Sequence, residues 1–216
     1  MRLTAWLLVL ALSGCGSSSS ASSGSGPTPR ATVTESDVGN RPFAGRCTAT
    51  YEAENDITLV VLPVSDDFML GFVLPGDGWE GECPFGSPQL AIATNEAVER
   101  MATVSVDTTV IGPVDVEAYA NAQSAGALEA LREQGIEAEG APAQMMGGNI
   151  YVLTFRIEDQ PGQFLLQFNA YHVVPTHNGL LRYHISQTSR DPSALNAAAP
   201  TLLNAVRAFG GAQAGD

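Results

Sequence analysis

Short apolar stretches alternate with turn-forming residues through the middle of the chain. Residues 48–64 have an extended pattern, strongest in the β-branched and leucine run at 57–61, and a continuous apolar segment follows at 68–74. The cluster Pro75-Gly76-Asp77-Gly78 then favours a turn. Two further segments, 89–94 and 101–110, have strand composition, the second being rich in Thr and Val. The pattern therefore predicts at least four strands before residue 111.

The apolar period changes to that of a helix at residue 115. Apolar side chains between Val116 and Leu131 fall on one half of a helical wheel and charged ones on the other, which predicts an amphipathic helix over 115–134 that stops at Gly135. A second helix is expected near the C-terminus, with Asp191 as its cap and a narrow apolar stripe on one side. Because a proline lacks the N–H for an interior helical bond, Pro200 should kink or split this helix, leaving 201–209 as its secure part.

Three alternating segments lie between the two helices. Their apolar positions interleave with largely polar neighbours, in three sets. The sets are Tyr151, Leu153, Phe155 and Ile157; Phe164, Leu166, Phe168 and Ala170; and Leu181, Tyr183 and Ile185. Turn residues separate the segments, so an antiparallel meander with one buried face is expected. The order of elements predicts an α+β fold in which helices pack on an antiparallel sheet.

The first fifteen residues have the organisation of an export signal. Arg2 precedes an apolar stretch at 3–12 that is too short to span a bilayer, and small residues lead to Cys15. The run Leu12-Ser13-Gly14-Cys15 resembles a bacterial lipoprotein signal. That resemblance implies cleavage after residue 14, acylation of Cys15, and a cell-envelope location on a membrane, facing the periplasm or the cell surface.

The rest of the chain divides by composition. Residues 15–40 are expected to hold the acylated cysteine and a flexible tether, because the Ser- and Gly-rich part of this range cannot bury enough apolar surface to fold. Residues 41–210 have the length and apolar content of a single globular domain, and 211–216 are expected to form a disordered tail.

The charge of the chain limits its partners. Hydrophobic residues make up 44% and charged residues 15%, and the net charge is −13. All 10 basic residues are Arg, and they form no basic patch in the sequence, so no nucleic-acid partner is expected. The same charge would be repelled by anionic lipid head groups, and membrane attachment is therefore assigned to the lipid on Cys15.

Cys47 and Cys83 remain after Cys15 is assigned to the lipid. An even pair in an oxidising compartment predicts a disulfide. A metal-binding or catalytic role for these thiols is the alternative, but neither lies in a close cysteine pair or beside a histidine.

Two groups of side chains invite a metal-binding hypothesis. His172, His177 and His184 are close in sequence, yet the strand phase does not bring them to one face. The carboxylates of Asp77, Glu80 and Glu82 share a Gly-containing loop beside Trp79, but their spacing is not that of an EF-hand. Ordinary sheet and turn histidines and a solvated acidic loop are the alternatives, and no metal or cofactor is expected.

The sequence contains no nucleophile elbow around its serines. Ser186 lies two residues from His184, which places both on one face of a strand. Satisfied sheet residues explain such a pair as well as a hydrolytic site does, so no catalytic residue and no enzymatic activity are expected.

The order of elements, with Phe72-Val73-Leu74-Pro75, Gly78-Trp79, Gly148-Asn149-Ile150-Tyr151 and Ile185-Ser186, resembles the PsbP-like and DcrB-like family of small α/β/α sandwich proteins. The resemblance covers about residues 68–209. Residues 46–62 have no place in that pattern and form either an extra strand or a hairpin, and whether they join the main sheet stays open. The resemblance implies an accessory protein without common catalytic residues.

The leading hypothesis is a non-enzymatic, lipid-anchored envelope protein that binds a protein partner. The alternatives are an envelope lipoprotein that binds a small ligand or metal and, third, a hydrolase.

Overall fold

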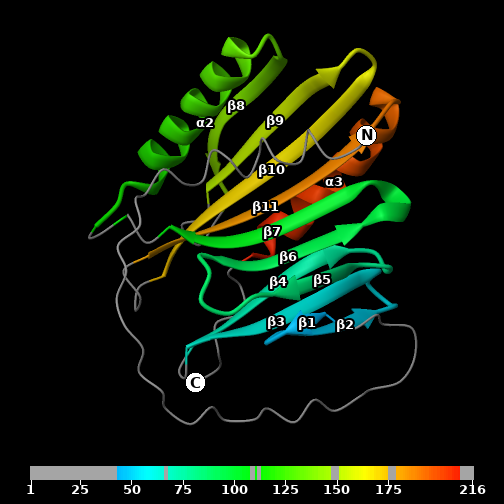
Figure 1. Ribbon diagram of the computed structural model, residues 1–216, viewed down its shortest axis with the longest axis vertical. Helices are drawn as coiled ribbons and strands as arrows, with labels where there is room; N and C mark the ends of the chain where they lie inside the picture. Colours follow the sequence, from blue (N-terminus) through cyan, green and yellow to red (C-terminus); the bar gives the residue numbers. More distant parts are fainter. Residues whose placement is uncertain are drawn as a thin grey trace. The chain divides into compact units, whose positions relative to one another are not determined.

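The computed structural model (Figure 1) describes residues 43–65, 68–107, 110, 113–146, 151–174 and 179–209. The chain divides into two units, Met1–Gly39 and Asn40–Asp216, and every described residue belongs to the second. Cys15, the predicted signal and tether, His177, and the predicted tail at 211–216 lie outside the described residues.

The second unit contains two β-sheets. The larger has eight strands, and all neighbouring strands are antiparallel except the first pair. In spatial order they are β1 (Ala44–Gly45), β5 (Glu80–Cys83), β6 (Gln89–Asn95), β7 (Arg100–Asp107), β11 (Gly179–Ser189), β10 (Gln163–Val174), β9 (Tyr151–Gln160) and β8 (Glu137–Met145). The smaller sheet consists of β2 (Thr48–Glu52), β3 (Ile57–Ser65) and β4 (Phe68–Pro75).

The extended segment predicted at 48–64 is therefore a hairpin, β2–β3, and it does not join the main sheet. Its turn at residues 53–56 ends with Asp56 at φ 50°, a left-handed conformation that Asp tolerates better than most residues. The Tyr51 hydroxyl donates to the Asp56 carboxylate (2.9 Å) and closes the turn. β7 is described as far as Asp107; residues 108 and 109 of the predicted segment lie outside the described residues, and residue 110 is not in a strand. The sequence did not predict β1, β5 or β8.

Two α-helices and one short 3₁₀ helix, η1 (Glu96–Val98), accompany the sheets among the described residues. α2 (Val116–Glu133) begins where the sequence predicts, because the Asp115 carboxylate accepts from the Ala118 N–H (3.0 Å). Gly135 follows its end at φ 73°. Within the described part of the chain, no helix is long and apolar enough to cross a membrane.

Pro200 does not split the last helix, and that part of the prediction is wrong. α3 (Pro192–Arg207) runs continuously through Pro200. Pro200 lies on the exposed side of the helix, while the buried side is formed by Leu195, Ala198, Leu202, Ala205 and Val206. The buried stripe therefore holds the helix on both sides of the proline. What Pro200 removes is the N–H that would bond to the Asn196 carbonyl.

The two helices pack on opposite faces of the large sheet. β9 shows this directly, because neighbouring residues of a strand point to opposite faces. A Cβ on Gly140 would contact both Leu128 of α2 and Phe155 of β9, while the next residue, Arg156, donates to Asn196 of α3 (2.8 Å). α2 thus covers the Phe155 face over β8 and β9, and α3 covers the Arg156 face (Figure 1).

The expected meander of β9, β10 and β11 is present, but the prediction that its apolar sets share one buried face is wrong. Phe155 of β9 pairs with Gln167 of β10, so Phe155 and Ile157, the described members of the β9 set, lie on the α2 face. The sets that begin at Phe164 and Leu181 lie on the opposite face, with α3. Alternation within one strand shows which of its residues share a face. The pairing register decides on which side of the sheet that face lies.

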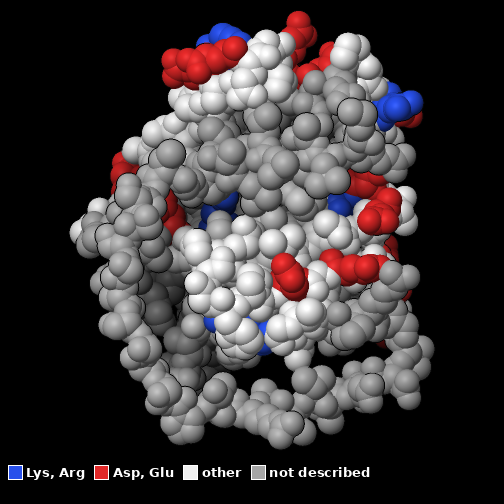
Figure 2. Space-filling model, in the orientation of Figure 1, with Lys and Arg blue, Asp and Glu red and all other residues white. Residues whose placement is uncertain are grey.

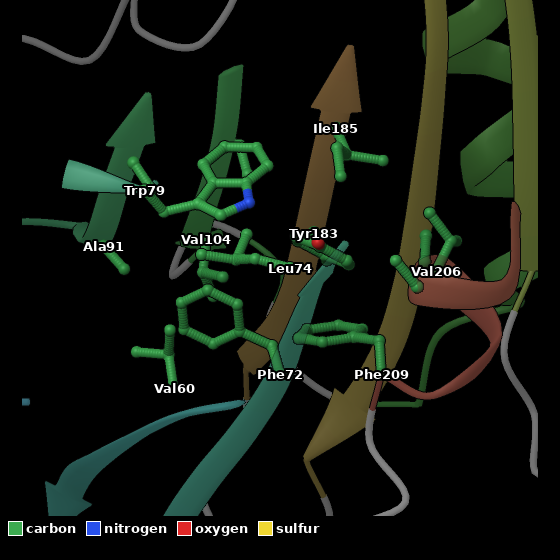
Figure 3. Packing of buried hydrophobic residues seen from close by; sticks show 14 of the residues in the cluster. Val60, Phe72, Leu74, Trp79, Ala91, Val104, Tyr183, Ile185, Val206 and Phe209 are labelled. Carbon is green, nitrogen blue, oxygen red and sulfur yellow. The ribbon is translucent and has the colours of Figure 1, made fainter. Parts of the chain in front are cut away.

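The main core lies between the α3 face of the large sheet and the small sheet (Figure 3). Tyr183 of β11 is at its centre, with ring centroids 5.7 Å from Phe72 of β4 and 5.1 Å from Phe209. The Tyr183 hydroxyl donates to the Val73 carbonyl (2.7 Å) and so links the two sheets. Trp79 is also buried, and its indole N–H donates to the Pro75 carbonyl (3.0 Å). The second unit is a mixed α/β fold built on one large sheet and two helices.

Candidate functional site

A groove lies between the start of α3 and the outer strands of the large sheet. The β9–β10 hairpin and the first turns of α3 are neighbours in Figure 1, and β8 forms the edge of the sheet beside them. The groove has a volume of about 290 Å³ and is open to solvent. This is close to the lower limit of typical ligand pockets, large enough for a side chain or a small molecule.

The strand register sets the floor of the groove as two rows across β8, β9 and β10. One row consists of Glu137, Glu158 and Phe164, and the other of Glu139, Arg156 and Leu166. Directly paired residues share one face of an antiparallel sheet, so all six side chains lie on the α3 side. The rows are apolar beside α3 and charged toward the sheet edge.

The wall of the groove is the first part of α3, contributed by Pro192, Leu195 and Asn196. Leu195 is buried against the core, and Asp191 holds the helix start by accepting from the Ser193 N–H (2.9 Å). Hydrogen bonds to Ser193 are the main cause of a lowered pKa at Asp191. This wall is therefore fixed to the core and held at its N-terminus.

The charged side chains of the groove differ in their hydrogen-bond and cross-strand partners. Arg156 donates to the Asn196 side chain (2.8 Å) and lies opposite Glu139 across the strand pair. Glu158 accepts from the Gly162 N–H in the hairpin turn (2.9 Å). Glu137 lies directly opposite Glu158, and like charges in that position destabilise a sheet. The groove thus carries three carboxylates against one guanidinium.

Sequence reasoning missed this groove. Its residues come from three elements that are far apart in the chain, and no motif joins them. The alternation of Glu137-Ala138-Glu139-Gly140 was the available signal for a strand with one acidic face. The lack of β-branched residues and the presence of Pro142 conceal that strand.

A second polar arrangement lies on the opposite face of the large sheet. The ring nitrogens of His184 are 3.1 Å (Nδ1) from Asn169 Oδ1 and 3.2 Å (Nε2) from Ser186 Oγ. With the proton on Nδ1, the ring donates to Asn169 and accepts from the Ser186 hydroxyl, as the base of a hydrolytic triad does. The structure thus brings together the Ser186–His184 pair noted in the sequence and adds a third member.

The environment of His184 opposes a catalytic role. Ser186, His184 and Asn169 are 1%, 2% and 4% exposed. Burial, with a smaller effect of the Arg182 charge, lowers the pKa of His184 to about 3. A general base works best with a pKa near the operating pH, and this imidazole resists the proton it would have to accept. The arrangement satisfies three buried polar side chains.

The predicted metal-site candidates do not assemble within the described residues. His172 pairs with Leu181 and lies on the α3 face, whereas His184 lies on the other face. Partial burial lowers the pKa of His172. Asp77 accepts from the Gly78 N–H (2.7 Å), and its carbonyl accepts from the Asn95 side chain (2.7 Å). No group of three or more metal-binding side chains is found in the part of the chain that the structure describes.

The predicted Cys47–Cys83 disulfide is present. The two Cα atoms are 5.8 Å apart, within the normal range for the bond, and 36 positions separate the residues. The bond ties the entry to β2 in the small sheet to the end of β5 in the large one. Next to it, the Arg46 guanidinium lies 5.7 Å from the ring centre of Phe85, which is 76% exposed.

Charged side chains on one face of the molecule form no single patch among the described residues (Figure 2). On the face that Figure 2 shows, the described Asp, Glu and Arg side chains occupy separate small areas.

No protein family matches the chain. No curated protein matches it either.

Proposed function

We propose that this chain is a lipid-anchored protein of the bacterial cell envelope whose folded unit binds another protein and catalyses no reaction. The disulfide is the observation that carries the location. Disulfides form and persist in oxidising compartments, and Cys47 and Cys83 are paired and buried. The lipoprotein-like run that ends at Cys15 supplies the address and the anchor.

A PsbP-like or DcrB-like α/β/α arrangement is part of this proposal. Helices on opposite faces of an antiparallel sheet support it, as does the position of Trp79 after the Pro75 turn. The three-stranded sheet, which shares a face with α3, is an addition to that pattern. Accessory proteins of this kind act through contacts, and the groove beside α3 is the site that such a contact would use.

The buried state of the serine–histidine–asparagine arrangement favours binding over catalysis. A substrate must reach the nucleophile, and Ser186 is 1% exposed. The low pKa of His184 removes the second requirement, a base that takes the serine proton at neutral pH.

Acylation of Cys15 is the direct test of the proposed function. We expect labelled palmitate to enter the protein in growing cells and the label to disappear in Cys15→Ser, with accumulation of the uncleaved precursor. The Cys47→Ala/Cys83→Ala double variant is the control, because it removes two cysteines and leaves the acylation site. Incorporation of label into Cys15→Ser, or its absence from the unaltered protein, would contradict the anchor.

The oxidation state tests the compartment separately. Protein collected from cells with an alkylating agent and no reductant should carry no label on Cys47 or Cys83 by mass spectrometry. Two alkylated thiols would place the chain in a reducing compartment.

A further inference from the structure

We propose that the groove beside α3 binds an extended peptide segment through an Arg or Lys side chain, and that the peptide backbone pairs with the edge of β8. This rests on the proposed binding function and names the chemistry of the partner. The groove residues of β8 and β9 and the first turns of α3 carry the inference.

Charge complementarity selects a cation. The groove contains the carboxylates of Glu137, Glu139 and Glu158 and a single guanidinium, that of Arg156. Glu139 is opposite Arg156, but Glu137 and Glu158 face each other with no described cation between them. A cationic head group placed between these two carboxylates would turn an unfavourable cross-strand pair into two favourable ones.

The acceptors of the groove point to a head group with several donors. Arg156 already donates to the Asn196 side chain. The Glu137 and Glu158 carboxylates together offer four acceptor oxygens, one of which accepts from the Gly162 N–H. A guanidinium offers five N–H donors and an ammonium three, and neither accepts.

The order of residues in each row determines what an entering side chain meets. From the sheet edge inward, one row runs Glu137, Glu158 and Phe164, and the other runs Glu139, Arg156 and Leu166. A side chain from a strand beside β8 therefore meets the carboxylates first, and the apolar part of the floor lies behind them. This order suits a side chain that carries its charge at its far end.

The sheet edge provides a place for the peptide backbone. β8 is the last strand of the large sheet, and a strand at the edge can pair with an added one. The second half of β8 is protected: it has a register irregularity between Ala141 and Gln144, it contains Pro142, and the Ala143 N–H donates to Asn121 of α2 (2.9 Å). The first half, from Glu137 to Gly140, pairs regularly with β9 and lies at the groove.

Peptide binding to the purified full-length protein tests the proposal by fluorescence anisotropy. The probe is a labelled seven-residue peptide in which Thr and Val alternate around a central Arg, compared with the same peptide carrying norleucine at the centre. We expect the Arg peptide to bind and high salt to weaken it, and we expect the norleucine peptide to bind much less. Equal binding of the two peptides would overturn the proposal.

Variants locate the site. Glu137→Gln/Glu158→Gln should weaken binding by roughly two- to thirtyfold, the range covered by two exposed ion pairs. Glu129→Gln/Glu133→Gln, on the exposed side of α2, makes the same charge change away from the groove and should bind as the unaltered protein does. Urea midpoints compare folding among the variants. Equal weakening in both double variants would refute the groove and leave only a non-specific charge effect.

The edge pairing has its own probe. Two methylated peptides are compared. In one, methyl groups on the backbone nitrogens of alternate residues block the N–H donors along one edge of the extended peptide, and in the other, methylation of the remaining residues blocks the donors along the opposite edge. One pattern should abolish binding and the other should preserve it. Preserved binding with both patterns would refute pairing with β8. Failure of all peptides to bind leaves the palmitate result at Cys15 unaffected, so the two proposals fail separately.

Discussion

Removing the Cys47–Cys83 bond should destabilise the folded unit by about 4 kcal/mol. With 36 positions between the two cysteines, this is the loop-closure entropy that the bond removes from the unfolded chain. For a domain of this size, each kcal/mol changes the melting temperature by roughly 2–4 °C, so a decrease of roughly 8–16 °C is expected. The bond joins two sheets that also share a core, so the reduced protein should remain folded.

The measurement is urea unfolding of the Cys15→Ser chain with and without reductant, followed by tryptophan fluorescence. Cys47→Ala/Cys83→Ala in the same background is the second perturbation, and it should be somewhat less stable than the reduced protein because Cys83 is fully buried and alanine leaves space there. An entropic origin also predicts a larger dependence of the unfolding free energy on urea without the bond, because the unfolded chain then exposes more surface.

An unchanged urea midpoint after verified reduction would refute this reasoning. It would mean that the unfolded chain is already constrained in this region, or that the bond strains the folded state by as much as it restricts the unfolded one. An unchanged urea dependence with a lower midpoint would move the cause from the unfolded chain to packing.

Three further predictions concern single positions. His184 has a pKa of about 3 in the folded chain and about 6.5 when unfolded, so the unfolded state alone takes up a proton between these values. The effect of His184 on the unfolding free energy is absent above pH 6.5 and grows as the pH falls, reaching about 3 kcal/mol of destabilisation at pH 4.5. His184→Gln should lose this part of the pH dependence in urea titrations. An unchanged slope of unfolding free energy against pH in that variant would contradict the prediction. Gly126→Ala, in the middle of α2 with nothing near the added Cβ, should raise the unfolding free energy by about 1 kcal/mol. Gly81→Ala should lower it, because the Cβ would come within 2.5 Å of the Ile92 carbonyl and 2.4 Å of the Phe43 ring; a stable Gly81→Ala protein would show that β5 can shift.

Local chemistry made α2 predictable from sequence, as it did the caps of both helices. Asp115 and Asp191 cap the helices that follow them, and apolar stripes continue from each cap. The meander was also accessible, because alternation and turn residues coincide there. The disulfide followed from an even pair of thiols in a presumed oxidising compartment.

Long-range pairing explains most of what sequence reasoning missed. β5 and β8 contain few β-branched residues, and each is a strand because a neighbour supplies its hydrogen bonds. The side of the sheet on which Phe155 lies depends on its pairing with Gln167, which no local pattern states. The groove depends in turn on that register and on α3, and so could not be found from β8 alone.

The order of strands gives the large sheet a seam between its two halves. Strands from residues 44–107 lie on one side of it, strands from residues 137–189 lie on the other, and the halves meet only where β7 pairs with β11. While the chain is being made, one side of β7 stays unpaired until residues 179–189 emerge. During that interval the unpaired edge of β7 is open to pairing with another nascent molecule.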